Sequence, residues 1–211
     1  MAIRIRVTFA KSEPMRFTSH LDLFRAWERT LRRAGVPVLF SQGFNPRPRF
    51  QLAAALPLGF TSECEVIDAW LTDDSPQVSD IKSALIQVQP PGIEIRDIVK
   101  IDPGSPPLQK LINSAEYLVT ILDQVPQLSA NVEDILNKDV LPRQRRGKSY
   151  DLRPLIEELS VSSPDEGERQ RLFMRLTAQE GKTGRPEEVL LTLDIPPEST
   201  RIHRLGLIFA E

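Results

Sequence analysis

The sequence is poor in the residues that most often carry chemistry. Its 211 residues contain one cysteine, Cys64, and two histidines, and aromatic residues make up 6% of the chain. A single thiol excludes an internal disulfide, a four-cysteine zinc site and a three-thiolate anchor for an iron–sulfur cluster. Any redox chemistry connected with this protein is therefore expected to reside in another chain.

Long apolar runs are also lacking. Charged residues or prolines interrupt every apolar stretch well before the roughly 18 residues that a membrane-spanning helix needs. The first nine residues, MAIRIRVTF, lack the apolar core and small-residue cleavage site of a secretory signal. We therefore expect a soluble, cytoplasmic protein.

Familiar catalytic motifs are missing as well. The segment Gly181-Lys182-Thr183 resembles the end of a phosphate-binding P-loop, but the first glycine of that motif falls on Leu176. The sequence has no HExxH motif, no dinucleotide fingerprint after a strand and no nucleophile elbow. A classical enzyme is not expected, and no cofactor or metal ion is predicted for this chain.

Positive charge is concentrated in two islands. The whole chain has a net charge of −2, but residues 1–50 carry ten Lys/Arg against three Asp/Glu, and residues 140–155 carry five against one. The remaining segments are acidic. If the fold brings the two islands together on one concave face, they form a positive surface that attracts phosphates.

Hydrophobic periodicity divides the chain into two similar halves. In the first half, arginine alternates with apolar residues over residues 3–9, as in a half-buried strand. Ser19 and Asp22 then fit a capping box, and Leu21, Phe24 and Leu31 recur at helical spacing until Gly35. Further strands are predicted at residues 36–40, 50–56, 66–71 and 93–101, and a second helix at residues 76–88.

The second half repeats this order of elements after a proline-rich segment at residues 102–108. Strands are predicted at residues 117–121, 140–146, 155–161, 172–178 and 202–209, and helices at residues 129–137 and 186–193. We therefore predict an α+β protein of two tandem ferredoxin-like (split β-α-β) units with antiparallel sheets. The expected domains are residues 1–101 and 115–211, joined by a proline-rich linker at residues 102–114.

A basic stripe lies along the predicted first helix. Arg25, Arg29 and Arg32 are spaced at i, i+4 and i+7, with Arg33 beside them, and the helix has few acidic neighbours to neutralise them. This pattern favours phosphate contact. A solvated helix face with no partner is the alternative.

The loop at residues 41–50, SQGFNPRPRF, combines one glycine, two prolines, two arginines and two aromatic residues. Prolines restrict the backbone, and Phe44 or Phe50 can stack on an unpaired base. In the alternative interpretation, both phenylalanines cap the core and the prolines shape a turn. The binding candidates in this loop are Phe44, Asn45, Arg47 and Arg49.

The second island, LPRQRRGKSYDLRP at residues 141–154, surrounds one glycine and one tyrosine with cations. If it is extended, Arg143 and Arg145 lie on one side and Arg146 and Lys148 on the other. Such a ribbon suits an RNA backbone, but it equally suits an edge strand that charge protects from aggregation. The binding candidates are Arg143, Arg145, Arg146, Lys148, Tyr150 and Arg153.

His20 is the one histidine in a plausible catalytic position. It lies in the first turn of the predicted helix, close in sequence to Arg16 and Ser19, where the helix dipole disfavours the imidazolium form. A neutral imidazole can act as the base in metal-free RNA cleavage. A structural hydrogen bond is the alternative role, and Arg16 is also a candidate phosphate ligand.

Several segments closely resemble one known family. They are MRFTSHLD at residues 15–22, RAG at 33–35, SQGFNP at 41–46, LPLG at 56–59 and GKSYDLRP at 147–154. Together they resemble the radical SAM-linked protein family, and the N-terminal likeness covers roughly residues 3–72. The resemblance implies a domain of unknown function that is encoded beside, or fused to, a cobalamin-binding radical SAM protein, which would carry the cluster and the cobalamin.

These features favour an accessory domain that binds RNA, such as tRNA or rRNA, or a ribonucleoprotein for a radical SAM enzyme. Two alternatives remain open. The same surfaces can dock on the radical SAM protein itself, as a protein-interaction module. Alternatively, the chain is a metal-independent endoribonuclease that uses His20.

Overall fold

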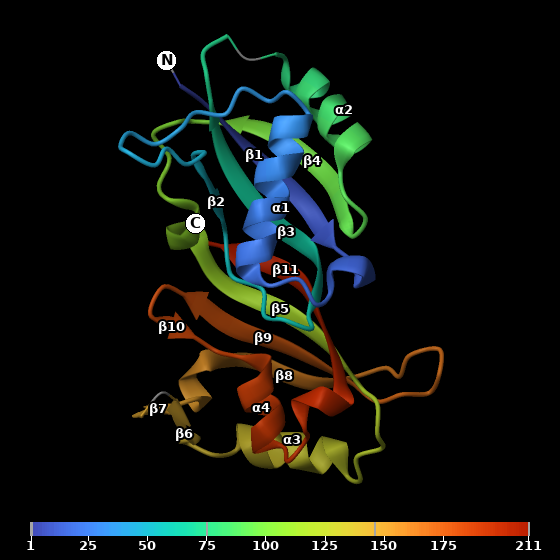
Figure 1. Cartoon of the computed structure of the whole chain (residues 1–211). Helices are drawn as coiled ribbons and strands as arrows, with labels where there is room; N and C mark the ends of the chain where they lie inside the picture. The colour runs from blue at the N-terminus through green and yellow to red at the C-terminus, as the bar shows by residue number, and fades with distance from the viewer. Residues whose placement is uncertain (1, 75, 146, 211) are drawn as a thin grey trace. The chain divides into compact units, whose positions relative to one another are not determined.

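The computed structural model describes residues 2–74, 76–145 and 147–210. The chain forms two compact units, Met1–Leu111 and Ile112–Glu211 (Figure 1). Strands within each unit pair antiparallel, and the described residues include four α-helices. The predicted α+β class is confirmed. No helix in the described ranges is both long and apolar enough to cross a membrane.

The first unit combines a four-stranded sheet with two α-helices. Along the sheet the strand order is β4-β1-β3-β2. Both helices lie on the same face of this sheet (Figure 1). Its elements are β1 (Ile3–Lys11), α1 (His20–Arg33), β2 (Phe50–Leu52), β3 (Thr61–Leu71), α2 (Val78–Val88) and β4 (Ile93–Ile101), with short 3-10 turns at Glu13–Met15 and Leu108–Leu111.

Helix α1 begins and ends where the sequence predicts. The Ser19 side chain accepts a hydrogen bond from the backbone N–H of Asp22, and Gly35 follows the helix with a φ of +67°. Trp27 is fully buried against the edge of Phe9 on β1, with ring centroids 4.8 Å apart. Leu21 was expected to face the core but is exposed, because the buried stripe begins at Leu23 and continues through Trp27 and Leu31.

A buried ion cluster covers the opposite face of the first sheet. Asp68 on β3 accepts hydrogen bonds from both Arg4 (2.7 Å) and Arg6 (2.8 Å) on β1. Asp68 is 0% exposed and Arg4 is 1% exposed. Arg4 also donates to the backbone carbonyls of Ser105 (2.6 Å) and Pro106 (3.0 Å). The cluster therefore fastens the proline-rich segment to the sheet.

The proline-rich segment is for this reason part of the first unit. Leu108 is fully buried, and its backbone N–H donates to the side chain of Gln51 at 2.9 Å. The boundary between the units falls after Leu111, and Ile112 already begins a strand. The linker predicted at residues 102–114 is thus divided between a packed segment and the start of that strand.

The second unit contains further antiparallel strands and two α-helices. Its main sheet has the strand order β11-β5-β9-β8, with β10 also paired to β9, and β6 and β7 form a separate hairpin. Helices α3 and α4 bury Val132, Ile135, Val189 and Leu190. The elements are β5 (Ile112–Ile121), α3 (Leu128–Leu136), β6 (Pro142–Arg145), β7 (Lys148–Asp151), β8 (Ile156–Ser162), β9 (Arg171–Gln179), β10 (Lys182–Thr183), α4 (Pro186–Thr192) and β11 (Thr200–Phe209).

One strand prediction is wrong. Residues 36–40 form no strand in the structure. They make two isolated bridges, from Val38 to Leu71 and from Phe40 to Pro48. Val36 is buried and Val38 packs on the core, but Phe40 is 57% exposed. The segment contacts β3 through the Val38–Leu71 bridge and the hydrogen bond from Leu39 N to Trp70 O (2.7 Å), without forming a ladder.

Candidate nucleic-acid interface

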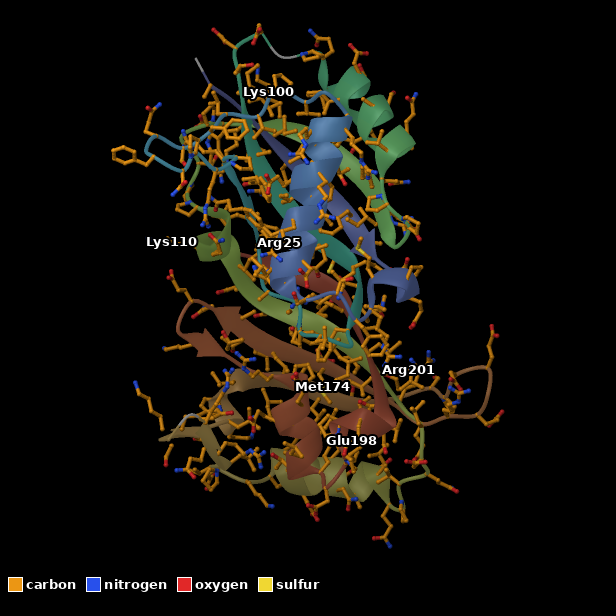
Figure 2. All side chains as sticks on the ribbon, in the orientation of Figure 1. Arg25, Lys100, Lys110, Met174, Glu198 and Arg201 are labelled. Atoms are coloured by element: carbon orange, nitrogen blue, oxygen red, sulfur yellow. The ribbon has the colours of Figure 1, made fainter. Side chains whose placement is uncertain are left out.

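The basic face of α1 is exposed. Arg25, Arg29, Arg32 and Arg33 all lie on the solvent side of the helix, as Figure 2 shows for Arg25. Arg25 forms an exposed ion pair with Asp22 at 3.3 Å, and Arg33 donates to the carbonyl of Val88 at 2.9 Å. Within the described residues, Arg29 and Arg32 make no ion pair. The predicted stripe therefore exists, with two of its members held by internal contacts.

The loop after α1 presents its aromatic tip to solvent. Two hydrogen bonds close it, from Ser41 N to Arg47 O (2.8 Å) and from Arg47 N to Ser41 Oγ (3.0 Å). Phe44 is fully exposed, and Asn45 and Arg47 are exposed beside it. Arg49 is exposed at the base of the loop, where its guanidinium lies 5.0 Å from the ring of Trp70.

Phe50 is not available for stacking on a base. It is buried and stacked on Phe24, with ring centroids 3.9 Å apart. The two interpretations of the loop are thus divided between its phenylalanines: Phe50 caps the core, whereas Phe44 remains open to a ligand.

Arg16 is held inside the first unit. Its Nε donates to the carbonyl of Gly59 at 2.8 Å, and its side chain is 13% exposed. It therefore joins two segments of the chain and is poorly placed to contact phosphate. His20 is exposed as the first residue of α1. In the described ranges, no group of three or more His, Cys, Asp or Glu side chains is arranged to hold a metal ion.

In the second unit, the basic ribbon folds into a hairpin. Arg143 pairs with Tyr150 and Arg145 pairs with Lys148 across β6 and β7. Cross-strand partners lie on the same face, so these four side chains share one face of the hairpin. Lys148 was expected opposite Arg143 and Arg145, and this is corrected because the chain turns back at Gly147. Arg146 lies outside the described residues.

This hairpin forms one wall of a pocket of about 980 Å³ in the second unit. Four cations line the pocket, and none of them has an ion pair within the described residues. Arg185 moreover has a buried Nε without a hydrogen-bond partner. We call these four side chains the pocket cations: Arg145, Lys148, Lys182 and Arg185.

Both carboxylates that line the pocket are engaged by donors of the fold. Asp151 accepts the backbone N–H groups of Leu141 (2.8 Å) and Arg153 (3.0 Å). Glu157 accepts the hydroxyls of Ser114 (2.6 Å) and Thr177 (2.9 Å). Four cations against two hydrogen-bonded carboxylates leave the pocket with an excess of positive charge, which favours an anionic ligand.

Two other predicted cations of the ribbon are committed to the fold. Arg143 pairs with Glu188 at 2.8 Å, and both are mostly buried. Arg153 donates to the carbonyls of Leu136 (3.1 Å) and Ile156 (3.3 Å). These two side chains therefore stabilise the fold around the hairpin, and they are poorly placed to bind an external anion.

The sequence analysis did not predict two of the four pocket cations. Lys182 and Arg185 come from the segment GKTGR at residues 181–185, whose sequence resembles only the end of a P-loop. The sequence feature that could have indicated these cations is the pair of glycines beside them, Gly181 and Gly184. A side chain at Gly184 would meet the carbonyl oxygen of Leu155 at 2.8 Å, so only glycine allows this segment to lie so close to Leu155.

Tyr150 provides a titration test of this arrangement. Burial and the charge of Glu188 raise the pKa of Tyr150 above the ordinary 10.0, although Arg143, Arg145 and Arg185 act in the opposite direction. The difference between the 295 nm titrations of the wild type and the Tyr150→Phe variant should have its midpoint above pH 10. Because the folded-state pKa is raised, the neutral phenol stabilises the fold at lower pH, and this stabilisation is lost as pH rises through that midpoint. A midpoint at or below pH 10 would show that Tyr150 is more solvated than the structure describes.

The two basic islands lie in different units. The α1 stripe and the loop belong to the first unit, and the hairpin belongs to the second. Their convergence on one concave face stays a prediction. The pocket, in contrast, is formed wholly by residues of the second unit.

Comparisons with known proteins give a family but no curated relative, since no curated protein matches the sequence. Three solved structures align over nearly all of both chains. An unknown protein from Galdieria sulphuraria has 15% identity, a TM-score of 0.29 and 100% coverage of each chain. The acetolactate synthase small subunit from Thermotoga maritima has 12% identity, a TM-score of 0.29 and coverage of 100% of this chain and 96% of that one. A putative glycine cleavage system transcriptional repressor has 11% identity, a TM-score of 0.28 and coverage of 100% and 99%.

TM-scores this low carry no argument about the fold or the activity of this protein. The family match extends over residues 4–186, and so it includes α1, the exposed loop, the hairpin and all the residues that line the pocket. On that match, the chain belongs to the family described as uncharacterized protein conserved in bacteria (DUF2344).

Proposed function

We propose that this protein is an accessory domain that binds RNA or a ribonucleoprotein for a cobalamin-binding radical SAM enzyme. One observation carries the RNA-binding part. The four pocket cations converge on one concavity without internal carboxylate partners in the described part of the chain, and an aromatic ring lies among them. Cations combined with an exposed aromatic face are typical of single-stranded RNA sites.

The architecture proposed for this function is a tandem pair of ferredoxin-like units. Each unit has the element order β-α-β-β-α-β in its main layer, and the strand orders β4-β1-β3-β2 and β11-β5-β9-β8 correspond position by position. The β6–β7 hairpin is then an insertion between the first helix and the second strand of the second unit. Binding residues are often carried by connecting segments that a rigid scaffold positions.

The radical SAM part of the proposal rests on the resemblance of the sequence motifs. The partner enzyme would carry the iron–sulfur cluster and the cobalamin, and this chain would hold the substrate in the cytoplasm. With a single cysteine, the chain itself has too few thiolates for such a cluster.

Salt dependence tests the RNA-binding proposal. Fluorescence anisotropy with labelled tRNA and rRNA fragments should show binding that weakens steeply as salt rises. Four phosphate contacts on a single strand predict a log–log slope of about −2.8, which is about a 50-fold loss of affinity between 50 and 200 mM salt. Absent binding, or binding that salt does not change, would contradict the proposal.

A second candidate function is docking on the radical SAM protein, and an apolar patch favours it. Phe17, Leu21 and Leu58 are 73%, 59% and 60% exposed. They lie in two motif segments that hydrogen bonds between Arg16 and Gly59 hold together. The cations of α1 follow the patch along the helix, so the complementary surface is an apolar area with an acidic margin.

A pull-down with the radical SAM protein separates the two candidates. Docking requires a complex that survives nuclease treatment and is weakened by Leu21→Ser. A complex that nuclease disperses would indicate that RNA bridges the two proteins. The matched control is Leu191→Ser, since Leu191 is a similarly exposed leucine in the other unit.

A further inference from the structure

We infer that the pocket of the second unit accepts one unpaired nucleotide of the bound RNA, with its phosphate on the pocket cations and its base on the ring of Tyr150. This inference rests on the RNA binding proposed above and makes it specific. It assigns separate tasks to the polar, charged and aromatic residues that line the pocket.

The size of the pocket suits a nucleotide unit. Its volume of about 980 Å³ is at the upper end of the range for small-ligand pockets, about 300–1,000 Å³. Proteins recognise RNA sequence mainly at unpaired nucleotides whose bases are turned out and stacked on aromatic side chains. A concavity of this size admits such a base, whereas a flat basic surface would only follow the backbone.

The phosphate end of the pocket is defined by charge. Arg145 and Lys148 are direct cross-strand partners, and like charges in this position destabilise a hairpin. An anion between them removes that repulsion. Lys182 extends the positive surface from β10 on the other side of the pocket, and Arg185 adds the buried Nε that lacks a partner.

The stacking surface is next to this charge. Tyr150 follows Lys148 by two residues on β7, so both side chains lie on the same face of the strand. Across the hairpin, Tyr150 is paired with Arg143, whose guanidinium is fixed by Glu188 at 2.8 Å. This ion pair fixes the side chain of the residue opposite Tyr150. Tyr150 is the one aromatic residue among the described residues that line the pocket.

Two amides supply the groups that can read a base edge. Gln179 Nε2 donates to Asn113 Oδ1 in the pocket wall. This bond leaves the Nδ2 donor of Asn113 and the Oε1 acceptor of Gln179 with further hydrogen-bonding capacity. Gln179 is also the direct cross-strand partner of Lys182, so an amide and a phosphate ligand are neighbours. Side-chain amides offer a donor and an acceptor together, as recognition of a base edge requires.

A comparison of intact and abasic RNA tests the inference. The full chain is titrated with a single-stranded eight-nucleotide RNA, with the same strand lacking all bases, and with inorganic polyphosphate. Tyr150→Ala should weaken binding of the intact strand by about 5- to 150-fold and leave binding of the other two polyanions unchanged. Tyr150→Phe should restore most of the loss, since the ring is retained.

The amides have their own readout. Gln179→Ala and Asn113→Ala should change the ranking of oligo-U, oligo-A and oligo-C without changing the salt slope. Circular dichroism of each variant checks that the fold is retained.

The possible failures are distinguishable. If intact and abasic strands bind equally, or if Tyr150→Ala weakens the binding of polyphosphate as much as the binding of RNA, the pocket recognises phosphate alone. The inference is then wrong, whereas the proposed RNA binding stands. If no strand binds, both proposals fail. Saturable binding of UMP without binding of any strand would make a free nucleotide the ligand and would also overturn the inference.

Discussion

Replacing Asp68 with alanine is expected to lower the free energy of unfolding by about 3–5 kcal/mol. The change removes the carboxylate that pairs with both Arg4 and Arg6, and it leaves Arg4, which is 1% exposed, as a buried charge without this counterion. Urea unfolding followed by circular dichroism measures the effect. The variant should also release the segment that Arg4 holds at Ser105 and Pro106, which limited proteolysis can detect.

The matched control is Asp97→Ala. Asp97 also pairs with a cation, Lys82 at 3.3 Å, but it is 63% exposed. Its removal should change stability by about 1 kcal/mol or less, because water screens an exposed pair. If the Asp68 variant does not fold, Asp68→Asn gives a second measurement, since it keeps the shape and loses only the charge. Equal effects of the Asp68 and Asp97 variants would contradict the description of a buried cluster.

Removing all four pocket cations together is expected to weaken RNA binding on the order of 100-fold at 50 mM salt, since each solvent-accessible ion pair contributes up to about 1 kcal/mol. In the variant R145A/K148A/K182A/R185A the log–log salt slope should flatten by about 2.8. Anisotropy titration at several salt concentrations gives both numbers. The loss should concern binding alone, because none of the four side chains has an ion pair in the described structure.

A control that removes two cations outside the pocket separates the effect of the pocket from that of net charge. Arg201→Ala and Lys138→Ala remove exposed cations of the same unit that lie outside the pocket (Figure 2 labels Arg201). Their combination should leave affinity within a few fold of wild type. An equal loss per charge in the two sets would mean that RNA responds to overall charge and that the pocket has no special role.

Local patterns predicted much of the fold. Alternating residues gave β1, and β4 matches its predicted range of residues 93–101. The Ser19 cap and Gly35 located α1. The prediction failed at residues 36–40, where an apolar run forms isolated bridges, one of them to Leu71 of β3, and no ladder. Periodicity reports which residues are buried, but strand pairing depends on neighbours that are distant in sequence.

The proline-rich segment shows a similar limit. Its composition is typical of a linker, but Arg4 hydrogen-bonds two of its carbonyls and Leu108 is buried. Nothing in the segment itself reveals this attachment. The residue responsible lies about a hundred positions earlier, in β1.

The candidate site was predicted in part. Charge counting found the ribbon with Arg145 and Lys148, but it did not distinguish them from Arg143 and Arg153, which bind Glu188 and backbone carbonyls. A cation is available to a ligand only if the fold leaves it unpaired. Charge counting did not find Lys182, because its segment lies in an acidic region of the sequence. The turn between β9 and β10 brings Lys182 to the pocket that the hairpin also lines.

The most direct test of RNA binding in the pocket is photocrosslinking. The full chain is irradiated with a single-stranded RNA that contains 4-thiouridine, and the adducts are located by mass spectrometry. Adducts at Tyr150, Lys148 and Lys182 are expected, and the adduct at Tyr150, which the variant R145A/K148A/K182A/R185A retains, should be lost in that variant. Adducts confined to residues outside the pocket, or adducts that persist in this variant, would contradict the account.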